Sequence, residues 1–257
     1  MKRLWNSFKI AFSMYSKIPM PQSDWKKENM RYIMCFFPLI GLVIGGLTMA
    51  WGIWGSMLVK SRLFYTIILV LIPVLVTGGI HLDGLLDTAD ALNSYQPREK
   101  KLEILKDSNS GAFAIITAMV YFLLYLGIYS EVTKKSLPVI CLGFVLSRAM
   151  GAFSIAAFPM AKNTGLAAAF SDGAQKKSVK ITSIIYAVLI LILMLAYNPV
   201  LGVCVMVGVG LEYFYYYKMS LKEFGGITGD LAGFHMQICE LVIAFSCVVG
   251  EILLHVI

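Results

Sequence analysis

Long apolar runs separated by short polar segments dominate the chain, and this pattern predicts membrane-spanning helices. A helix needs about 20 mostly apolar residues to cross a bilayer. We expect about seven such helices, near residues 33–59, 63–80, 112–129, 137–158, 181–197, 200–217 and 235–256. The pattern therefore predicts an all-α polytopic membrane protein with a single helical domain over residues 1–257.

The N-terminal segment, residues 1–32, follows a different pattern. Between Leu4 and Ile18, aromatic and aliphatic residues are interleaved with Lys9 and Lys17. This is typical of an amphipathic helix that lies at the membrane surface. A cleaved signal peptide would instead have a compact apolar core followed by small residues, which is absent here. We therefore expect an interfacial helix.

Composition supports the membrane assignment and adds an orientation. Only 14% of the 257 residues are charged, against about 25% in soluble domains. If the N-terminus is cytoplasmic, 17 of the 22 Lys and Arg residues fall on the cytoplasmic side and 4 on the other. Positive residues gather on the cytoplasmic side of membrane proteins. We therefore expect a multi-pass protein of the cell (inner) membrane with a cytoplasmic N-terminus, and we interpret the net charge of +7 as a topology signal, not as a sign of nucleic-acid binding.

The five cysteines occur singly and form no CxxC pair. Paired spacing is what marks a disulfide framework or a zinc site in sequence. We expect neither.

One acidic stretch, His81-Leu-Asp-Gly-Leu-Leu-Asp-Thr-Ala-Asp90, follows the second apolar run directly. We expect it to continue that helix to about residue 92. Helical spacing places Asp83, Asp87 and Asp90 within about 40° of one another. Like charges on one stripe repel, so the stripe needs a compensating cation. Oxygen ligands favour a hard divalent ion such as Mg²⁺.

Further polar residues lie where they can join this stripe. Glu103 and Asp107 are four residues apart in a helix that we expect to begin near residue 99 and to run into the third span. His81 can bind metal, donate a proton or cap the helix. Arg148, in the middle of the fourth span, must face an acid or a phosphate. Glu240, in the seventh span, is another candidate pocket acid.

A glycine-rich loop, Gly225-Gly-Ile-Thr-Gly-Asp230, falls on the same side as the acids in the charge count. Its backbone amides can approach an anion, and Thr228 and Asp230 add a hydroxyl and a carboxylate. The loop is not a P-loop, because it lacks the Gly-Lys-Ser/Thr ending.

These motifs, in this order, resemble the cobalamin synthase (adenosylcobinamide-GDP ribazoletransferase) family. The resemblance spans nearly the whole chain and includes Lys17-Ile-Pro-Met-Pro21, Phe37-Pro-Leu-Ile-Gly-Leu42, Leu102-Glu-Ile-Leu-Lys-Asp-Ser108 and Ser147-Arg148. Ala91 and Asn109 depart from it, since the family often has Gly and Arg at these places. It implies a magnesium-dependent membrane enzyme that joins adenosylcobinamide-GDP to alpha-ribazole, or to its phosphate, and releases GMP.

With this family in view, we assign roles to the candidate residues. The metal ligands are Asp83, Asp87, Asp90 and Asp107; the catalytic residues are Asp90, His81 and Arg148; the substrate-binding residues are Arg148, Gly225, Gly226, Thr228 and Asp230. The partners are the two small-molecule substrates and the lipid bilayer, and the small-residue face from Gly41 to Gly45 permits a homo-oligomer.

Two alternative functions remain. A lipid phosphotransferase of the CDP-alcohol type, or a prenyltransferase, also acts through arrays of acids, although the acid spacing of those families differs. A cation-coupled transporter would also hold charged residues within the membrane. Transporter sites lie near the bilayer midplane, whereas these acids cluster at one edge.

Overall fold

The computed structural model describes residues 2–107, 109–161 and 175–256. Within these residues the chain is helical, without a β-strand. The elements are α1 (Lys2–Tyr15), α2 (Lys27–Met30), α3 (Ile33–Leu58), α4 (Arg62–Thr77), α5 (Ile80–Asn93), α6 (Arg98–Ile104), α7 (Ala112–Ser130), α8 (Leu137–Ala157), α10 (Lys176–Tyr197), α11 (Pro199–Met219), the π-helix η1 (Ser220–Phe224) and α12 (Gly229–Val256). The all-α prediction is confirmed. Much of the polar loop 159–180 lies outside the described residues.

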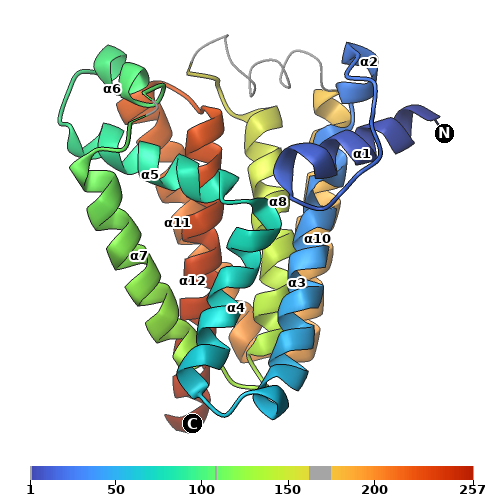
Figure 1. The fold of residues 1–257 in the computed structure, drawn as a ribbon, viewed down its shortest axis with the longest axis vertical. Helices are drawn as coiled ribbons and strands as arrows, with labels where there is room; N and C mark the ends of the chain where they lie inside the picture. The colour runs from blue at the N-terminus through green and yellow to red at the C-terminus, as the bar shows by residue number, and fades with distance from the viewer. Residues whose placement is uncertain (1, 108, 162–174, 257) are drawn as a thin grey trace.

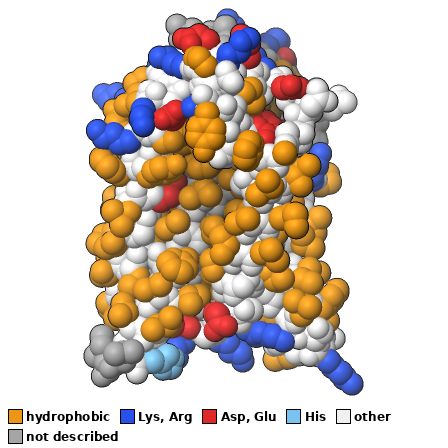
Figure 2. Space-filling view, turned by 90° about the vertical axis from the view of Figure 1, so that its left-hand side faces the viewer, with side chains coloured by type: hydrophobic (Ala, Val, Ile, Leu, Met, Phe, Trp, Pro, Cys, Tyr) orange, Lys and Arg blue, Asp and Glu red, His pale blue; other side chains and the backbone are white. Residues whose placement is uncertain are grey.

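The bundle has the dimensions and surface of a multi-pass membrane protein. Six helical segments of the described chain are long and apolar enough to cross a membrane, and α4 with α5 makes a seventh if this bent pair counts as one span. Figure 2 shows a broad band of hydrophobic side chains between two ends that carry the charges. The polytopic class predicted from the apolar runs is confirmed.

Helix α8 lies at the centre of the bundle and packs against α3, α10 and α12. The close approach of α3 depends on the small residues of its packing face. A Cβ atom on Gly45 would overlap the carbonyl oxygen of Cys141, and one on Gly41 would overlap that of Phe144. The predicted small-residue face is therefore occupied by α8 within the same chain.

The second predicted span does not continue straight into the acidic stretch. Gly78 and Gly79 adopt φ values of 66° and 80°, a left-handed conformation that only glycine adopts readily. These two residues end α4 and turn the chain, so that α5 is bent by 94° from α4 and runs across the bundle (Figure 1). The prediction of one helix to residue 92 is corrected in this respect. The bend directs the acidic helix along one end of the bundle.

A second correction concerns the helix that was predicted to begin near residue 99 and run into the third span. Helix α6 ends at Ile104, and α7 begins only at Ala112. Asp107 therefore lies in the connection between them and not on a helix with Glu103.

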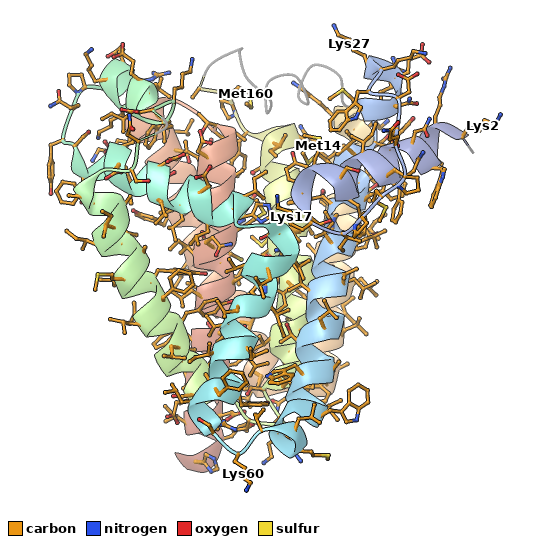
Figure 3. The ribbon with its side chains drawn as sticks, in the orientation of Figure 1. Lys2, Met14, Lys17, Lys27, Lys60 and Met160 are labelled. Atoms are coloured by element: carbon orange, nitrogen blue, oxygen red, sulfur yellow. The ribbon has the colours of Figure 1, made fainter. Side chains whose placement is uncertain are left out.

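The N-terminal helix α1 also lies across the bundle, at the same end as α5 (Figure 1). It packs against α3, burying Ile10, Ala11 and Phe12 while Trp5 remains exposed. Figure 3 shows Lys2, Lys27 and Met160 at this end and Lys60 at the other. The C-terminus lies at the end with Lys60.

Candidate active site

Two helices bring carboxylates together at the end of the bundle that carries α1. Asp83, Asp87 and Asp90 follow one another at helical spacing along α5, and Asp230 lies in the first turn of α12. The two helices approach closely at Gly84, where a Cβ atom would lie only 2.6 Å from the carbonyl oxygen of Asp230. The glycine between Asp83 and Asp87 thus lets α12 place its own acid beside the stripe.

The negative charges of these carboxylates repel one another. The negative charge of Asp87 is repelled by those of Asp83, Asp230 and Asp90, and the charge of Asp230 is repelled by that of Asp83. Among the described residues, no Lys, Arg or His forms an ion pair with any of the four. The predicted acidic stripe thus gains a fourth member, Asp230, which sequence reasoning had assigned only to substrate binding.

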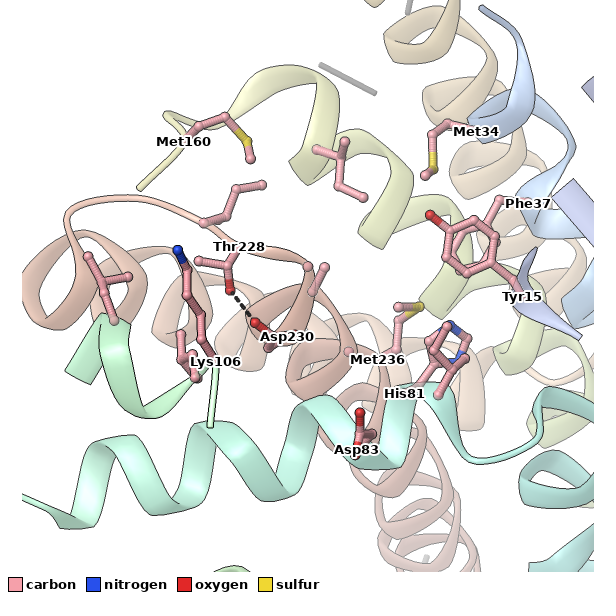
Figure 4. A pocket seen from close by; sticks show the side chains of 18 residues that line it. Tyr15, Met34, Phe37, His81, Asp83, Lys106, Met160, Thr228, Asp230 and Met236 are labelled. Atoms are coloured by element: carbon pink, nitrogen blue, oxygen red, sulfur yellow. Dashed lines mark hydrogen bonds between the residues drawn. The ribbon is translucent and has the colours of Figure 1, made fainter. Parts of the chain in front are cut away.

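A pocket of about 290 Å³ opens beside these acids. Its walls come from several helices and from the chain around residues 155–160 (Figure 4). It is lined by Tyr15, Met34, Phe37, Ile80, His81, Asp83, Leu102, Leu105, Lys106, Ile155, Met160, Ile227, Thr228, Gly229, Asp230, Ala232, Gly233 and Met236. Of the predicted site residues, His81, Asp83, Thr228 and Asp230 thus share one cavity.

The N-terminal turn of α12 faces this pocket. The backbone N–H of Leu231 donates a hydrogen bond to Oγ1 of Thr228 (3.2 Å), so Thr228 caps the helix. The preceding residue, Ile227, pairs with the chain after α8 through hydrogen bonds with Pro159 and Ala161. Helix N-termini carry partial positive charge and attract anions. The pocket therefore has a favourable place for a phosphate.

Gly225 and Gly226 do not form the predicted anion cradle. The N–H of Gly225 donates to the carbonyl of Leu221, and that of Gly226 donates to the carbonyl of Ser220, both at 3.0 Å. These bonds end η1, and neither glycine lines the pocket. Their conformation has a structural reason, since Gly225 is left-handed (φ 73°) and a side chain there would overlap Arg98.

Asp90 has a structural partner that the sequence did not reveal. Its two carboxylate oxygens accept hydrogen bonds from the N–H groups of Gly111 (2.6 Å) and Ala114 (2.8 Å). Asp90 therefore caps the N-terminus of α7 from a distance of more than twenty positions in sequence, and it does not line the pocket. Because both oxygens are engaged, Asp90 is poorly placed for its predicted roles as proton acceptor or metal ligand.

We expect the variant Asp90→Ala to destabilise the protein by about 1–2 kcal/mol, because removal of a capping side chain leaves backbone donors of α7 unsatisfied. Thermal unfolding in detergent measures this loss. Asp83→Ala is the matched control, and it should not lower stability because it relieves repulsion within the stripe. Equal destabilisation by both changes would contradict the capping role.

Asp107 and Glu103 do not join the cluster as predicted. Oδ1 of Asp107 accepts hydrogen bonds from the backbone and side-chain nitrogens of Asn109 (3.0 and 2.9 Å). Glu103 is exposed and forms an ion pair with Lys100 at 2.8 Å. Neither residue lines the pocket. Glu103 and Asp107 do not act together as expected, because α6 ends between them at Ile104.

Arg148 is paired with Glu240, deep in the bundle. Both side chains are almost fully buried, and Nη1 of Arg148 donates to Oε1 of Glu240 and to the carbonyl of Phe144. Ser147 also donates to Glu240. The sequence predicted that Arg148 faces an acid or a phosphate, and in the structure it faces the acid Glu240. Neither member of the pair lines the pocket, so the contact of Arg148 with substrate stays a prediction without support from this pocket.

A second buried polar cluster lies between α11 and α12. Glu212, His235 and Cys239 have ligand atoms within 4.8 Å of one another, and no other group of His, Cys, Asp and Glu among the described residues meets that condition. Within the cluster, Nδ1 of His235 and Oε1 of Glu212 are 2.9 Å apart. The carboxylates of the acidic stripe are thus more widely spaced than this triad.

Several pocket residues carry no signal in the sequence. Lys106 extends beside Thr228, and Tyr15, Met34, Phe37 and Met236 form the opposite end (Figure 4). Burial raises the pKa of Tyr15 above its ordinary value, so its hydroxyl stays protonated. These residues lie far apart in the chain, and only the resemblance of the Leu102–Ser108 and Phe37–Leu42 segments to a family singled out any of them.

Fold and site together define an α-helical, multi-pass membrane protein with a carboxylate-lined pocket at one end of its bundle. A family model described as cobalamin-5-phosphate synthase matches residues 7–248. The chain belongs to this family, which confirms the resemblance found in its motifs.

Three relatives of the chain share the name adenosylcobinamide-GDP ribazoletransferase. The protein of this name from Lachnoclostridium phytofermentans is 47% identical over 246 residues, which cover 96% of this chain and 94% of the relative. One from Clostridium botulinum (strain Alaska E43) is 32% identical, covering 96% and 98%. One from Clostridium perfringens (strain SM101) is 34% identical, covering 93% and 96%. No solved structure matches the chain.

Proposed function

We propose that this protein is an adenosylcobinamide-GDP ribazoletransferase. It joins adenosylcobinamide-GDP to alpha-ribazole, or to alpha-ribazole phosphate, and yields adenosylcobalamin, or its phosphate, together with GMP. The names of relatives that align over almost the whole chain support this activity. The structural observation that carries it is the group of Asp83, Asp87 and Asp230, which lies beside a pocket that the N-terminus of α12 faces. Within the described ranges of the chain, these three carboxylates form no ion pair with a cation.

The reaction is a displacement at phosphorus. A ribazole hydroxyl oxygen attacks the phosphorus attached to the cobinamide arm, and the bond from that phosphorus to the bridging oxygen breaks. GMP leaves with the bonding electron pair, and the hydroxyl proton passes to a carboxylate. We assign this last role to Asp230, because it lines the pocket and is held beside Thr228. Thr228, the N-terminal amides of α12 and Lys106 meet the phosphate oxygens.

We propose Asp83 and Asp87 as the residues that would hold Mg²⁺. Their donor set consists of carboxylate oxygens, which suit a hard cation, and their mutual repulsion favours one. Mg²⁺ is commonly held by one or two carboxylates together with substrate phosphates, which agrees with the wide spacing of the carboxylates. When bound, the ion neutralises negative charge that develops on the diphosphate as GMP departs.

We further propose that the protein lies in the inner membrane and that its pocket opens on the cytoplasmic side. The distribution of Lys and Arg supports this orientation, with 17 of 22 on the side that carries the N-terminus. Lys2 and Lys27 lie at the same end of the bundle as the pocket residue Met160 (Figure 3).

The activity is tested with purified protein in lipid vesicles that receive adenosylcobinamide-GDP, alpha-ribazole and Mg²⁺. We expect GMP and adenosylcobalamin in equal amounts, and neither product when alpha-ribazole is omitted or when a chelator removes the metal. The absence of both products would contradict the proposal. Product formed instead from a CDP-alcohol and a lipid would favour a lipid phosphotransferase, and ion-driven uptake without chemistry would favour a transporter.

A further inference from the structure

The two ends of the pocket differ in chemistry. At one end are Lys106, Thr228 and Asp230, all with polar groups near the N-terminus of α12 (Figure 4). At the other end the walls are aromatic rings and thioethers, and the residues there are Tyr15, Met34, Phe37, His81 and Met236. A ligand that fills this pocket must therefore have a polar end and a flat, apolar end.

Three rings from three helices form the apolar end. The ring centroid of Phe37 lies 4.7 Å from that of Tyr15 and 5.6 Å from that of His81, and the rings of Tyr15 and His81 are nearly parallel at 6.2 Å. Met34 and Met236 are almost fully buried beside them. Aromatic and thioether groups favour the faces and edges of another aromatic ring.

His81 brings a polar ring to this wall, and its two nitrogens have no partner in the part of the chain that the structure describes. The residue is 2% exposed, and neither of its ring nitrogens has a hydrogen-bond partner within the described chain. A buried polar atom without a partner costs about 1–3 kcal/mol. A neutral imidazole carries one donor and one acceptor, so a ligand ring nitrogen, which is an acceptor, can pair with the N–H of His81.

We infer that this pocket binds alpha-ribazole, with its benzimidazole-type base in the aromatic end and its ribose, or ribose phosphate, toward Asp230 and Lys106. His81 donates a hydrogen bond to the unsubstituted ring nitrogen of the base. The inference rests on the proposed function and assigns one of its two substrates to a defined cavity.

Size and polarity exclude the other substrate from this position. Pockets of about 300 Å³ lie at the small end of the range for ligand sites, which suits a nucleoside but not a corrinoid ring. The guanine of adenosylcobinamide-GDP would fit by size, yet its edge carries several donors and acceptors. Apart from His81 and Asp83, of which Asp83 is assigned to the metal, the rings and thioethers of the aromatic end offer these groups no partners, and each unpaired group weakens binding. Adenosylcobinamide-GDP then reaches the acids from outside the pocket.

The test measures binding of alpha-ribazole alone to the purified protein by calorimetry. We expect His81→Ala to weaken binding about tenfold, the effect of a lost hydrogen bond of about 1.4 kcal/mol. His81→Gln retains an N–H donor and should recover part of the affinity. Leu123→Ala, on the exposed face of α7, is the control and should bind as the wild type does. A riboside with an exocyclic amine on its base should bind more weakly than alpha-ribazole.

Steady-state kinetics separate the pocket assignment from the proposed function. In His81→Ala we expect a higher KM for alpha-ribazole and an unchanged KM for adenosylcobinamide-GDP. The reverse pattern, or alpha-ribazole binding that no His81 variant alters, would overturn the assignment. Wild-type protein that binds alpha-ribazole but releases no GMP would instead overturn the proposed function. If His81→Ala does not fold, as judged by size-exclusion chromatography and circular dichroism, His81→Gln decides between these outcomes by its own two KM values.

Discussion

The variant Asp87→Asn should lose GMP release by about a thousandfold while remaining folded in the membrane. Asp87 lies between Asp83 and Asp90 on α5, and its charge also interacts with that of Asp230, so its charge is central to the cluster. Asparagine keeps the size of the side chain but removes the charge that would hold a divalent cation. A loss of about 4 kcal/mol in transition-state stabilisation corresponds to this change in rate.

Two measurements make this expectation specific. The thermal unfolding temperature of the wild type should rise with Mg²⁺, because a ligand that binds only the folded state stabilises it, and that of Asp87→Asn should not. Glu131→Gln, which changes an exposed acid beyond α7, is the matched control and should keep wild-type rates. Wild-type rates in Asp87→Asn would remove Asp87 from the metal site.

The variant Arg148→Ala should unfold or fail to accumulate, for a reason unrelated to catalysis. Removing one partner of a buried ion pair leaves an uncompensated charge and costs about 3–5 kcal/mol. Here Glu240 would be left inside the bundle, within a helix that crosses the membrane. Yield after extraction and the thermal unfolding temperature in detergent measure the effect.

The double variant Arg148→Met, Glu240→Leu distinguishes this structural role from substrate binding. Replacing both charges by apolar groups of similar size is often neutral or stabilising, so we expect the folded protein to return. GMP release should return with it, because neither residue lines the pocket. A double variant that folds normally but releases no GMP would restore the original prediction that Arg148 contacts the diphosphate.

Local pattern predicted the helices and part of the site. Helical spacing placed Asp83 and Asp87 on one face because i,i+4 geometry holds whatever surrounds the helix. The same reasoning could not foresee the bend at Gly78 and Gly79. Two adjacent glycines permit a left-handed turn, but the rest of the fold decides whether the chain takes it.

The roles predicted for Asp90 and Arg148 differ from the structure because each residue has a partner that is distant in sequence. Asp90 looked like its neighbours on α5, yet it caps α7, and nothing in its local sequence distinguishes a capping acid from a metal-binding one. Arg148 needed an acid, and the choice of Glu240 over the acidic stripe depends on how α8 packs against α12. The pocket residues Tyr15 and Phe37 meet only because α1 crosses α3.

That crossing makes the N-terminal helix a part of the pocket wall. Tyr15 is the last residue of α1. Two residues further on, the N–H of Lys17 donates a hydrogen bond to the carbonyl of Val76 in α4 (2.8 Å), which fixes this end of α1 to the bundle. The cavity is therefore complete only while α1 rests against the bundle. Since α1 is also the segment with the composition of a helix that lies at the membrane surface, we expect the bilayer surface to help hold this wall of the pocket in place. A shortened chain lacking residues 2–15 would keep every carboxylate of the cluster and still lose a wall of the cavity.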